Sequence, residues 1–100
     1  MKKFEVFIHP EAENDLKKAY LYYREIDSKL AKRFLKITNI TVRDLKKMPF
    51  FQVKYDNMRL RIIRKFPYAI HFTVDETKNI VSIYGIRFAP SNPSNWPKEK

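Results

Sequence analysis

The hydrophobic pattern of this 100-residue chain changes its period at Pro49. Between residues 10 and 48, apolar side chains recur every three or four positions, which is typical of one face of an α-helix. Beyond Pro49, apolar and polar side chains alternate in short runs, which indicates β-strands. A similar alternating run, Phe4 to Ile8, precedes the helical region. The chain is therefore expected to place its helices between one initial strand and a later group of strands.

The helical region is predicted to contain two helices. Pro10 suits the first helical position, and the acidic residues that follow it suit the positive end of a helix dipole, so the first helix covers about residues 10–25. Asp27 or Ser28 can cap the second helix. The second helix is expected to end near Met48-Pro49, because a residue that precedes proline avoids helical backbone geometry.

The region after Pro49 is predicted to contain residues 52–55 and 58–64 as two strands or one bent strand, and further strands at 68–74 and 79–88 with a turn at 75–78 between them. The order β-α-α-β-β-β gives an α+β fold class, in which a two-helix hairpin packs on one face of a small, mainly antiparallel sheet. The other face of the sheet is expected to stay partly open. A chain of this length suits a single domain, residues 1–100, with about residues 89–100 as a C-terminal tail.

Composition excludes several classes of protein. The chain has no cysteine, so neither disulfides nor cysteine-ligated zinc can stabilise it. His9 and His71 lack carboxylate or cysteine neighbours at metal-binding spacing, so no metal site and no cofactor are expected. The first apolar run is interrupted by Glu5 and is too short for a signal peptide, and no later run could cross a membrane. We therefore expect a cytoplasmic protein without a membrane partner.

The net charge of +10 is concentrated in the middle of the chain. Residues 1–28 carry five basic and six acidic groups, residues 29–65 carry twelve and two, and residues 66–100 carry four and three. Such a field favours phosphate backbones or an acidic protein partner, although charged helix faces are often only solvated.

Residues 58–72, MRLRIIRKFPYAIHF, combine the arginines with two predicted strands. Alternation assigns Leu60, Ile62, Tyr68, Ile70 and Phe72 to the helix-packed face. It assigns Arg59, Arg61, Ile63, Ala69 and His71 to the open face. A face that mixes arginine with apolar residues suits a groove that an acidic, amphipathic partner segment covers.

Three stretches carry a resemblance to a known family. They are IHPEAENDL at residues 8–16, RKFPYAIHFTV at 64–74 and NPSNW at 92–96. Together with the helix pair, their order and spacing resemble the RelE/ParE superfamily of type II toxin–antitoxin systems, and more its ParE branch. The resemblance implies a growth-inhibiting toxin that forms a hetero-oligomer with a cognate acidic antitoxin. It implies DNA gyrase as the target in the ParE branch, and the ribosome and its mRNA in the RelE branch.

The two branches imply different site residues. The leading interpretation is a gyrase-inhibiting toxin without catalytic residues, with Arg59, Arg61, Ile63, Ala69 and His71 binding the antitoxin and Arg87 and Trp96 binding the target. The alternative is a RelE-like endoribonuclease in which Arg59, Arg61, Arg64 or Arg87 stabilises the scissile phosphate. Ala69 stands where a nuclease resembling RelE would carry an arginine, and the indole of Trp96 cannot replace a catalytic tyrosine.

Some of these residues also have plain structural interpretations. Trp96 can pin the tail onto the domain, and Gly85, the only glycine, can mark a bulge or a close backbone approach in the last strand. A third functional interpretation is a toxin-like fold that has lost its toxicity and serves as a binding module or co-repressor.

Overall fold

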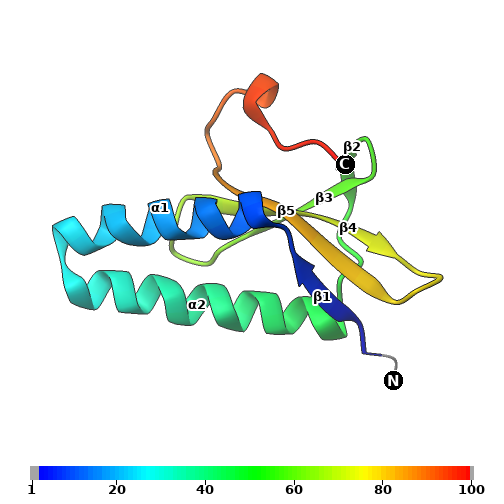
Figure 1. Ribbon diagram of the computed structural model, residues 1–100, viewed down its shortest axis with the longest axis horizontal. Helices are drawn as coiled ribbons and strands as arrows, with labels where there is room; N and C mark the ends of the chain where they lie inside the picture. The colour runs from blue at the N-terminus through cyan, green and yellow to red at the C-terminus, as the bar shows by residue number, and fades with distance from the viewer. Residues whose placement is uncertain (1–2, 100) are drawn as a thin grey trace.

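The structure is a computed structural model that describes residues 3–99, and it contains a helical hairpin on one face of a five-stranded sheet. Its elements are β1 (Glu5–Ile8), α1 (Pro10–Ile26), α2 (Ser28–Lys47), β2 (Val53–Tyr55), β3 (Met58–Ile62), β4 (Tyr68–Asp75), β5 (Ile80–Phe88) and the short 3-10 helix η1 (Pro93–Asn95). Figure 1 shows α1 and α2 running side by side along the sheet. The predicted order and α+β class are confirmed.

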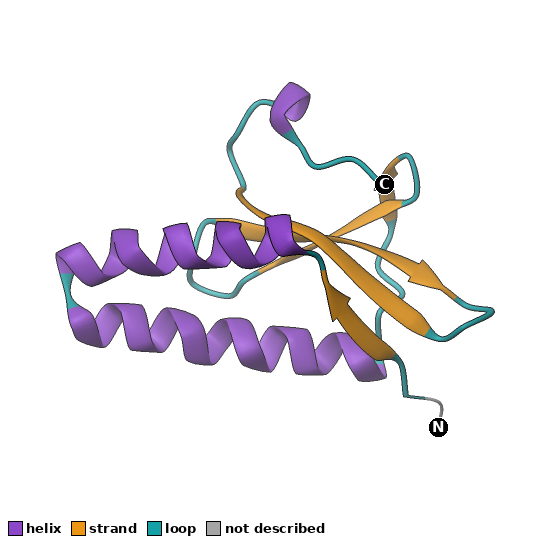
Figure 2. Ribbon diagram, in the orientation of Figure 1, coloured by secondary structure: helices purple, strands orange, loops and turns teal. Residues whose placement is uncertain are grey.

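The sheet has the strand order β1-β5-β4-β3-β2. Strands β2 to β5 pair antiparallel with their neighbours, whereas β1 pairs parallel with β5. The helical hairpin carries the chain from β1 at one edge of the sheet to β2 at the other edge (Figure 2). One helix-covered face and one face without helices result from this arrangement.

The helix ends follow the local signals in the sequence. Pro10 occupies the first turn of α1, and the side chain of Asp27 caps α2 by accepting a hydrogen bond from the Lys29 backbone N–H at 3.0 Å. His9 precedes α1 but makes no side-chain cap; its ring stacks on Tyr84 instead, at 4.1 Å between centroids. The contact with Tyr84 thus joins the start of α1 to β5.

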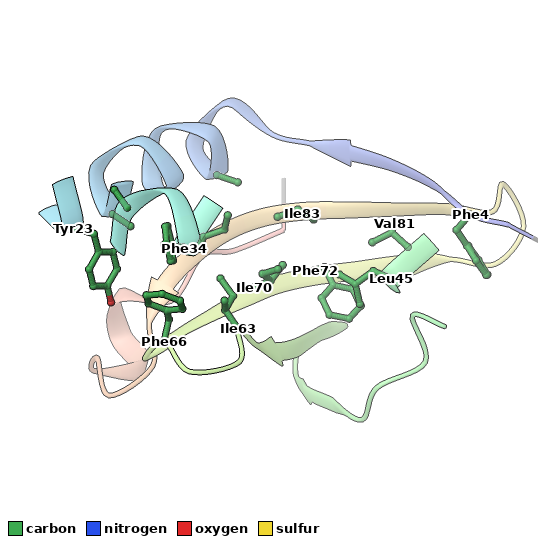
Figure 3. Close-up of a cluster of buried hydrophobic side chains, with 14 residues drawn as sticks. Phe4, Tyr23, Phe34, Leu45, Ile63, Phe66, Ile70, Phe72, Val81 and Ile83 are labelled. Carbon is green, nitrogen blue, oxygen red and sulfur yellow. The ribbon is translucent and has the colours of Figure 1, made fainter. Parts of the chain in front are cut away.

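The core lies between the helices and the central strands (Figure 3). At one end, the ring of Phe34 lies 5.1 Å from both Tyr23 and Phe66. Toward the other end, Phe4, Leu45 and Val81 close the space between α2 and the strands. Ile70 and Phe72 are fully buried in this core and Tyr68 packs against it, as predicted.

The predicted faces of β3 are wrong. Directly opposite residues share a face of the sheet, and Arg59 pairs with Phe72 while Arg61 pairs with Ile70. Both arginines therefore lie on the helix side, as does Ile63, which is completely buried. Leu60 and Ile62, predicted to be core residues, pair with His71 and Ala69 on the opposite face, and Ile62 is 52% exposed.

The reason for the reversal is that neither helix covers the arginines of β3. The segment at residues 49–52 crosses this region, and its Phe50 and Phe51 rings lie 5.7 Å and 5.0 Å from the guanidinium carbons of Arg59 and Arg61. Arg59 also donates a hydrogen bond to the Phe51 carbonyl at 3.0 Å. Aromatic faces and a carbonyl let these arginines pack on an apolar face, although the Nε atoms of Arg59 and Arg61 are buried without a hydrogen-bond partner.

Gly85 marks both a bulge and a close approach, as predicted. The pairing of β4 with β5 shifts between His71 and Phe72, which leaves Tyr84 as the extra residue of β5. A side chain at position 85 would place its Cβ 2.8 Å from Pro97 Cγ and 3.2 Å from the Asp15 carboxylate. Glycine is therefore required here by the chain that crosses it.

Candidate functional site

The C-terminal tail, residues 89–99, leaves β5 and returns across the face of the sheet that carries no helix. Figure 1 shows its end beside β2, far along the sheet from where the tail starts. The Trp96 ring lies 5.0 Å from Tyr55 and 5.6 Å from His71, measured between ring centroids. We call Tyr55, His71, Trp96 and Pro97 the tail latch, because together they hold the tail on the sheet.

Hydrogen bonds fix the geometry of the tail latch. The Tyr55 hydroxyl donates to the Pro97 carbonyl at 2.7 Å. A hydroxyl has one proton, so the Tyr55 oxygen must accept its second hydrogen bond, at 3.0 Å, from the Nδ1–H of His71. The imidazole is thereby held as the neutral Nδ1–H tautomer, and the tail is tied to β2 and β4 at one point.

Burial opposes charge on the two titratable side chains of the tail latch, His71 and Tyr55. Burial, together with the positive charge of Arg87, lowers the pKa of His71 to about 4. Burial, together with the negative charge of Asp56, raises the pKa of Tyr55 to about 12. Both side chains are therefore neutral near pH 7, so neither is poised to exchange protons with a substrate.

The lowered pKa of His71 is expected to make the fold acid-sensitive. In the unfolded chain His71 binds a proton below about pH 6.5, whereas the folded chain resists it until about pH 4. Stability from this group is therefore fully present above pH 6.5 and is lost as the pH falls toward 4. Urea unfolding at pH 7 and pH 4.5 is expected to show about 2 kcal/mol of this loss.

His71→Gln is the variant that isolates the effect of His71, since glutamine does not titrate. It is expected to lose about 2 kcal/mol less than the parent between the two pH values. If His71→Gln and the parent fell in parallel, a buried neutral His71 would be ruled out.

Arg87 links α1, β5 and the tail. Its Nε donates to the Asp15 carboxylate at 2.8 Å, its Nη2 lies 3.5 Å from the Glu11 carboxylate, and its Nη1 donates to the Asn95 carbonyl at 2.8 Å. Asp15 also accepts the backbone N–H of Ile86 at 3.0 Å, where β1 no longer pairs with β5. All three nitrogens of the Arg87 guanidinium thus contact oxygen atoms of the same chain.

The four arginines of the nuclease alternative do not come together. Arg59 and Arg61 lie on the helix side of β3, and Arg64 is exposed in the turn after β3. Arg87 is paired with carboxylates on β5, which β4 separates from β3. No one position in the fold lets all four contact a single phosphate. Within residues 3–99, no three histidine, aspartate or glutamate side chains gather as a metal site would require.

The antitoxin-binding residues predicted on the open face divide into two groups. Ala69 and His71 lie on that face but are fully or almost fully buried, and Trp96 of the tail packs on His71. Arg59, Arg61 and Ile63 lie on the other face, so the structural basis for predicting their role is lost.

The open face exposes two large apolar side chains. Phe7, which pairs with Ser82, and Ile62 are each 52% exposed. Beside β1 the face is hollowed by a pocket of about 370 Å³, lined by Glu5, Val6, Phe7, His9, Ile80, Ser82 and Tyr84. These residues form a surface onto which another chain could pack apolar side chains.

Comparison with known proteins identifies the fold. The family described as the ParE toxin of the type II toxin–antitoxin system parDE matches residues 6–88. The chain belongs to the ParE toxin family. A solved structure described as "Chromosomal ParDE TA system from P. aeruginosa" is similar to this ParE-family toxin, with a TM-score of 0.76 and 15% sequence identity. The match covers 88% of this chain and 98% of that one. The search among curated proteins finds no match to this chain.

Sequence reasoning missed several residues that hold this ParE-family toxin together. Tyr55 ties the tail to the sheet, and Asp15 joins α1 to β5, yet neither attracted attention as a site residue. Tyr55 lies in a three-residue strand, and Asp15 looks like one more acidic residue near a helix start. A pair such as Asp15 and Arg87, separated by 72 positions, leaves no local signal.

One interpretation of the tail agrees with the structure. Trp96 packs on Tyr55 and His71, which is the pinning contact expected as its plain structural role.

Among the residues described, no helix of this ParE-family toxin is both long and apolar enough to span a membrane.

Proposed function

We propose that this ParE-family toxin inhibits growth by binding DNA gyrase in the cytoplasm and trapping the enzyme on cleaved DNA, and that a cognate acidic antitoxin neutralises it. The family match over residues 6–88 carries the proposal, since gyrase poisoning is what resemblance to the ParE branch implies. The toxin acts by binding another enzyme and needs no reacting side chains of its own.

The arrangement of the cations supports binding over RNA cleavage. Cleavage at a 2′-hydroxyl needs a base, a cation and an acid around one phosphate. Here Arg87 is held by Asp15 and Glu11, and Arg59 and Arg61 lie on the other face of the sheet. His71, the one histidine near Arg87, is buried and neutral.

The target surface in this proposal is the turn of the tail. Asn92, Pro93, Ser94 and Asn95 are exposed around η1, immediately before Trp96 of the tail latch. Arg87 fixes the turn through the Asn95 carbonyl, and Trp96 fixes it through the tail latch. Both residues then act by positioning the turn that meets gyrase.

The antitoxin surface in this proposal is the uncovered part of the open face. Phe7, Ile62 and the hollow beside β1 offer apolar contacts for an amphipathic segment that folds on binding. The similar solved structure is described as a ParDE system, which supports an antitoxin as partner.

A cleavage assay tests the proposal. The full-length toxin is incubated with gyrase, ATP and supercoiled plasmid, and the reaction is stopped with detergent and protease. Linear plasmid is expected to accumulate above the level with gyrase alone, because trapped gyrase leaves a double-strand break. Trp96→Ala is expected to reduce the linear product by loosening the turn, whereas Tyr22→Ala, a change at an exposed aromatic residue of α1, should not.

Induction in cells separates the proposal from its alternatives. Filamentation with a DNA-damage response is expected, and co-expression of a short acidic protein encoded beside the toxin should restore growth. Prompt loss of translation with codon-phased mRNA cuts, and gyrase unaffected, would establish the nuclease alternative instead. Absence of any growth effect would point to a binding module that has lost its toxicity.

A further inference from the structure

We propose that the outer face of α2 binds the phosphate backbone of duplex DNA without sequence preference. Seven basic residues, all exposed, form this surface, which we call the basic stripe: Lys29, Lys32, Arg33, Lys36, Arg43, Lys46 and Lys47. They recur at helical spacing on the side of α2 opposite its buried residues, over about 27 Å of helix. The stripe therefore points away from the sheet.

The positive charges of the basic stripe are not neutralised by ion pairs within residues 3–99. Within residues 3–99 the ion pairs are those of Arg87, so the stripe cations stay unpaired. At its C-terminal end, Lys3, Arg43, Lys46 and Lys47 surround a hollow of about 390 Å³ that no acidic side chain lines. An anion entering this hollow would meet only positive side chains.

The position of the charges is unfavourable for the helix itself. Cations near the C-terminus of a helix favour its dipole, which accounts for Lys46 and Lys47. Lys29 and Lys32, however, stand in the first turns of α2, where the first turn contains no acidic residue and the dipole disfavours positive charge. Like charges three or four positions apart, such as Lys32 and Lys36, also repel. Helix stability therefore does not explain the stripe, which supports a role in binding an anionic partner.

Duplex DNA fits this surface better than a protein or a single strand. An acidic protein segment would need apolar surface to bury, and Ile40 is the one large apolar side chain exposed along α2. Single-stranded nucleic acid is bound through aromatic side chains on which bases stack, and the stripe contains none. A straight row of cations needs only regularly spaced phosphates, which a duplex supplies.

The basic stripe and the open face lie on opposite sides of the molecule. The helices cover one face of the sheet, and the stripe is on the outer side of α2, away from that sheet. A partner on the open face leaves the stripe free. The inference does not depend on gyrase as the target: duplex binding and gyrase trapping are separate measurements, and either can fail alone.

Salt-dependent binding tests the inference. The full-length chain is titrated into a fluorescent duplex of about 20 base pairs and arbitrary sequence, between about 50 and 200 mM salt. With about five phosphate contacts, log K against log salt is expected to fall with a slope of about −4.5. Replacing Lys32, Lys36 and Arg43 by glutamine should make the slope shallower by about 2.7 and weaken binding at least about tenfold at about 100 mM salt.

The matched control removes the same number of charges elsewhere. Lys17, Lys78 and Lys98 are exposed outside α2, and their replacement by glutamine should change affinity by less than about twofold. Thermal melting is expected to show both variants folded, with the stripe variant at least as stable as the parent. We expect the stripe variant to keep this stability because replacing the three cations removes like-charge repulsion along α2.

Several results would overturn the inference. One is failure of the parent chain to bind the duplex at the lowest salt concentration. Another is an equal loss of affinity in both variants, which would make net charge the only determinant. Stronger binding to single-stranded RNA than to the duplex would contradict it, as would loss of antitoxin binding, with duplex binding intact, in the stripe variant.

Discussion

Phe34→Ala is expected to lower the free energy of unfolding by about 3–5 kcal/mol, the largest single effect in this structure. Phe34 is completely buried and packs against the rings of Tyr23, Phe66 and Tyr68, with centroids 5.1 to 5.6 Å away. Truncation removes apolar contacts from α1, the β3–β4 turn and β4 at once and leaves a cavity that these elements cannot all close. Urea unfolding monitored by circular dichroism measures the loss.

Tyr22→Ala is the control for this prediction. Tyr22 is also an aromatic residue on a helix, but it is 58% exposed, so its removal is expected to cost about 1 kcal/mol or less. Equal losses in the two variants would show that the hairpin does not pack on the sheet through Phe34.

Asp15→Ala is expected to lower the free energy of unfolding by about 2–3 kcal/mol, because it leaves two donors without their acceptor. The Asp15 carboxylate accepts from the Ile86 N–H at 3.0 Å and from Arg87 Nε at 2.8 Å. The Ile86 N–H lies where β5 has passed the end of β1, so no strand can replace the lost oxygen. Denaturant unfolding measures the change.

Glu11→Ala separates this contact from simple charge removal. Glu11 also faces Arg87, but at 3.5 Å and with its side chain 45% exposed, and exposed ion pairs contribute about 0–1 kcal/mol. A loss for Glu11→Ala as large as for Asp15→Ala would mean that net charge near Arg87 matters and the buried edge of β5 does not.

The helices were predictable from the sequence because their signals are local. Pro10 and Asp27 mark two helix starts, and Pro49 limits the second helix, each within a few residues of the observed bounds. The alternating runs likewise predict strands, since the period of two belongs to the strand itself. Gly85 was recognisable as a special position because it is the only glycine of the chain.

The faces of β3 were not predictable in the same way. Arg59, Arg61 and Ile63 share one face, as alternation requires, but the sequence cannot say which face the helices cover. The usual rule places arginine toward solvent. Here Phe50 and Phe51 cross the arginines on the helix side, and the segment that carries these rings has no periodic signal.

The tail latch depends on contacts between distant parts of the chain. Tyr55 and Pro97 are 42 positions apart, and their hydrogen bond needs the tail to cross the sheet at Gly85. The exposed turn at Asn92–Asn95 therefore has a fixed place only in the complete fold.

The parallel pairing of β1 with β5 sets the order in which the sheet can be completed during synthesis. Glu5 pairs with Ile80, so the first strand made must wait for the last strand before it gains its only neighbour in the sheet. Closing such a long loop costs chain entropy that local contacts do not repay, which slows folding. A ribosome that has not yet translated β5 therefore carries an incomplete sheet, without the tail that rests on it.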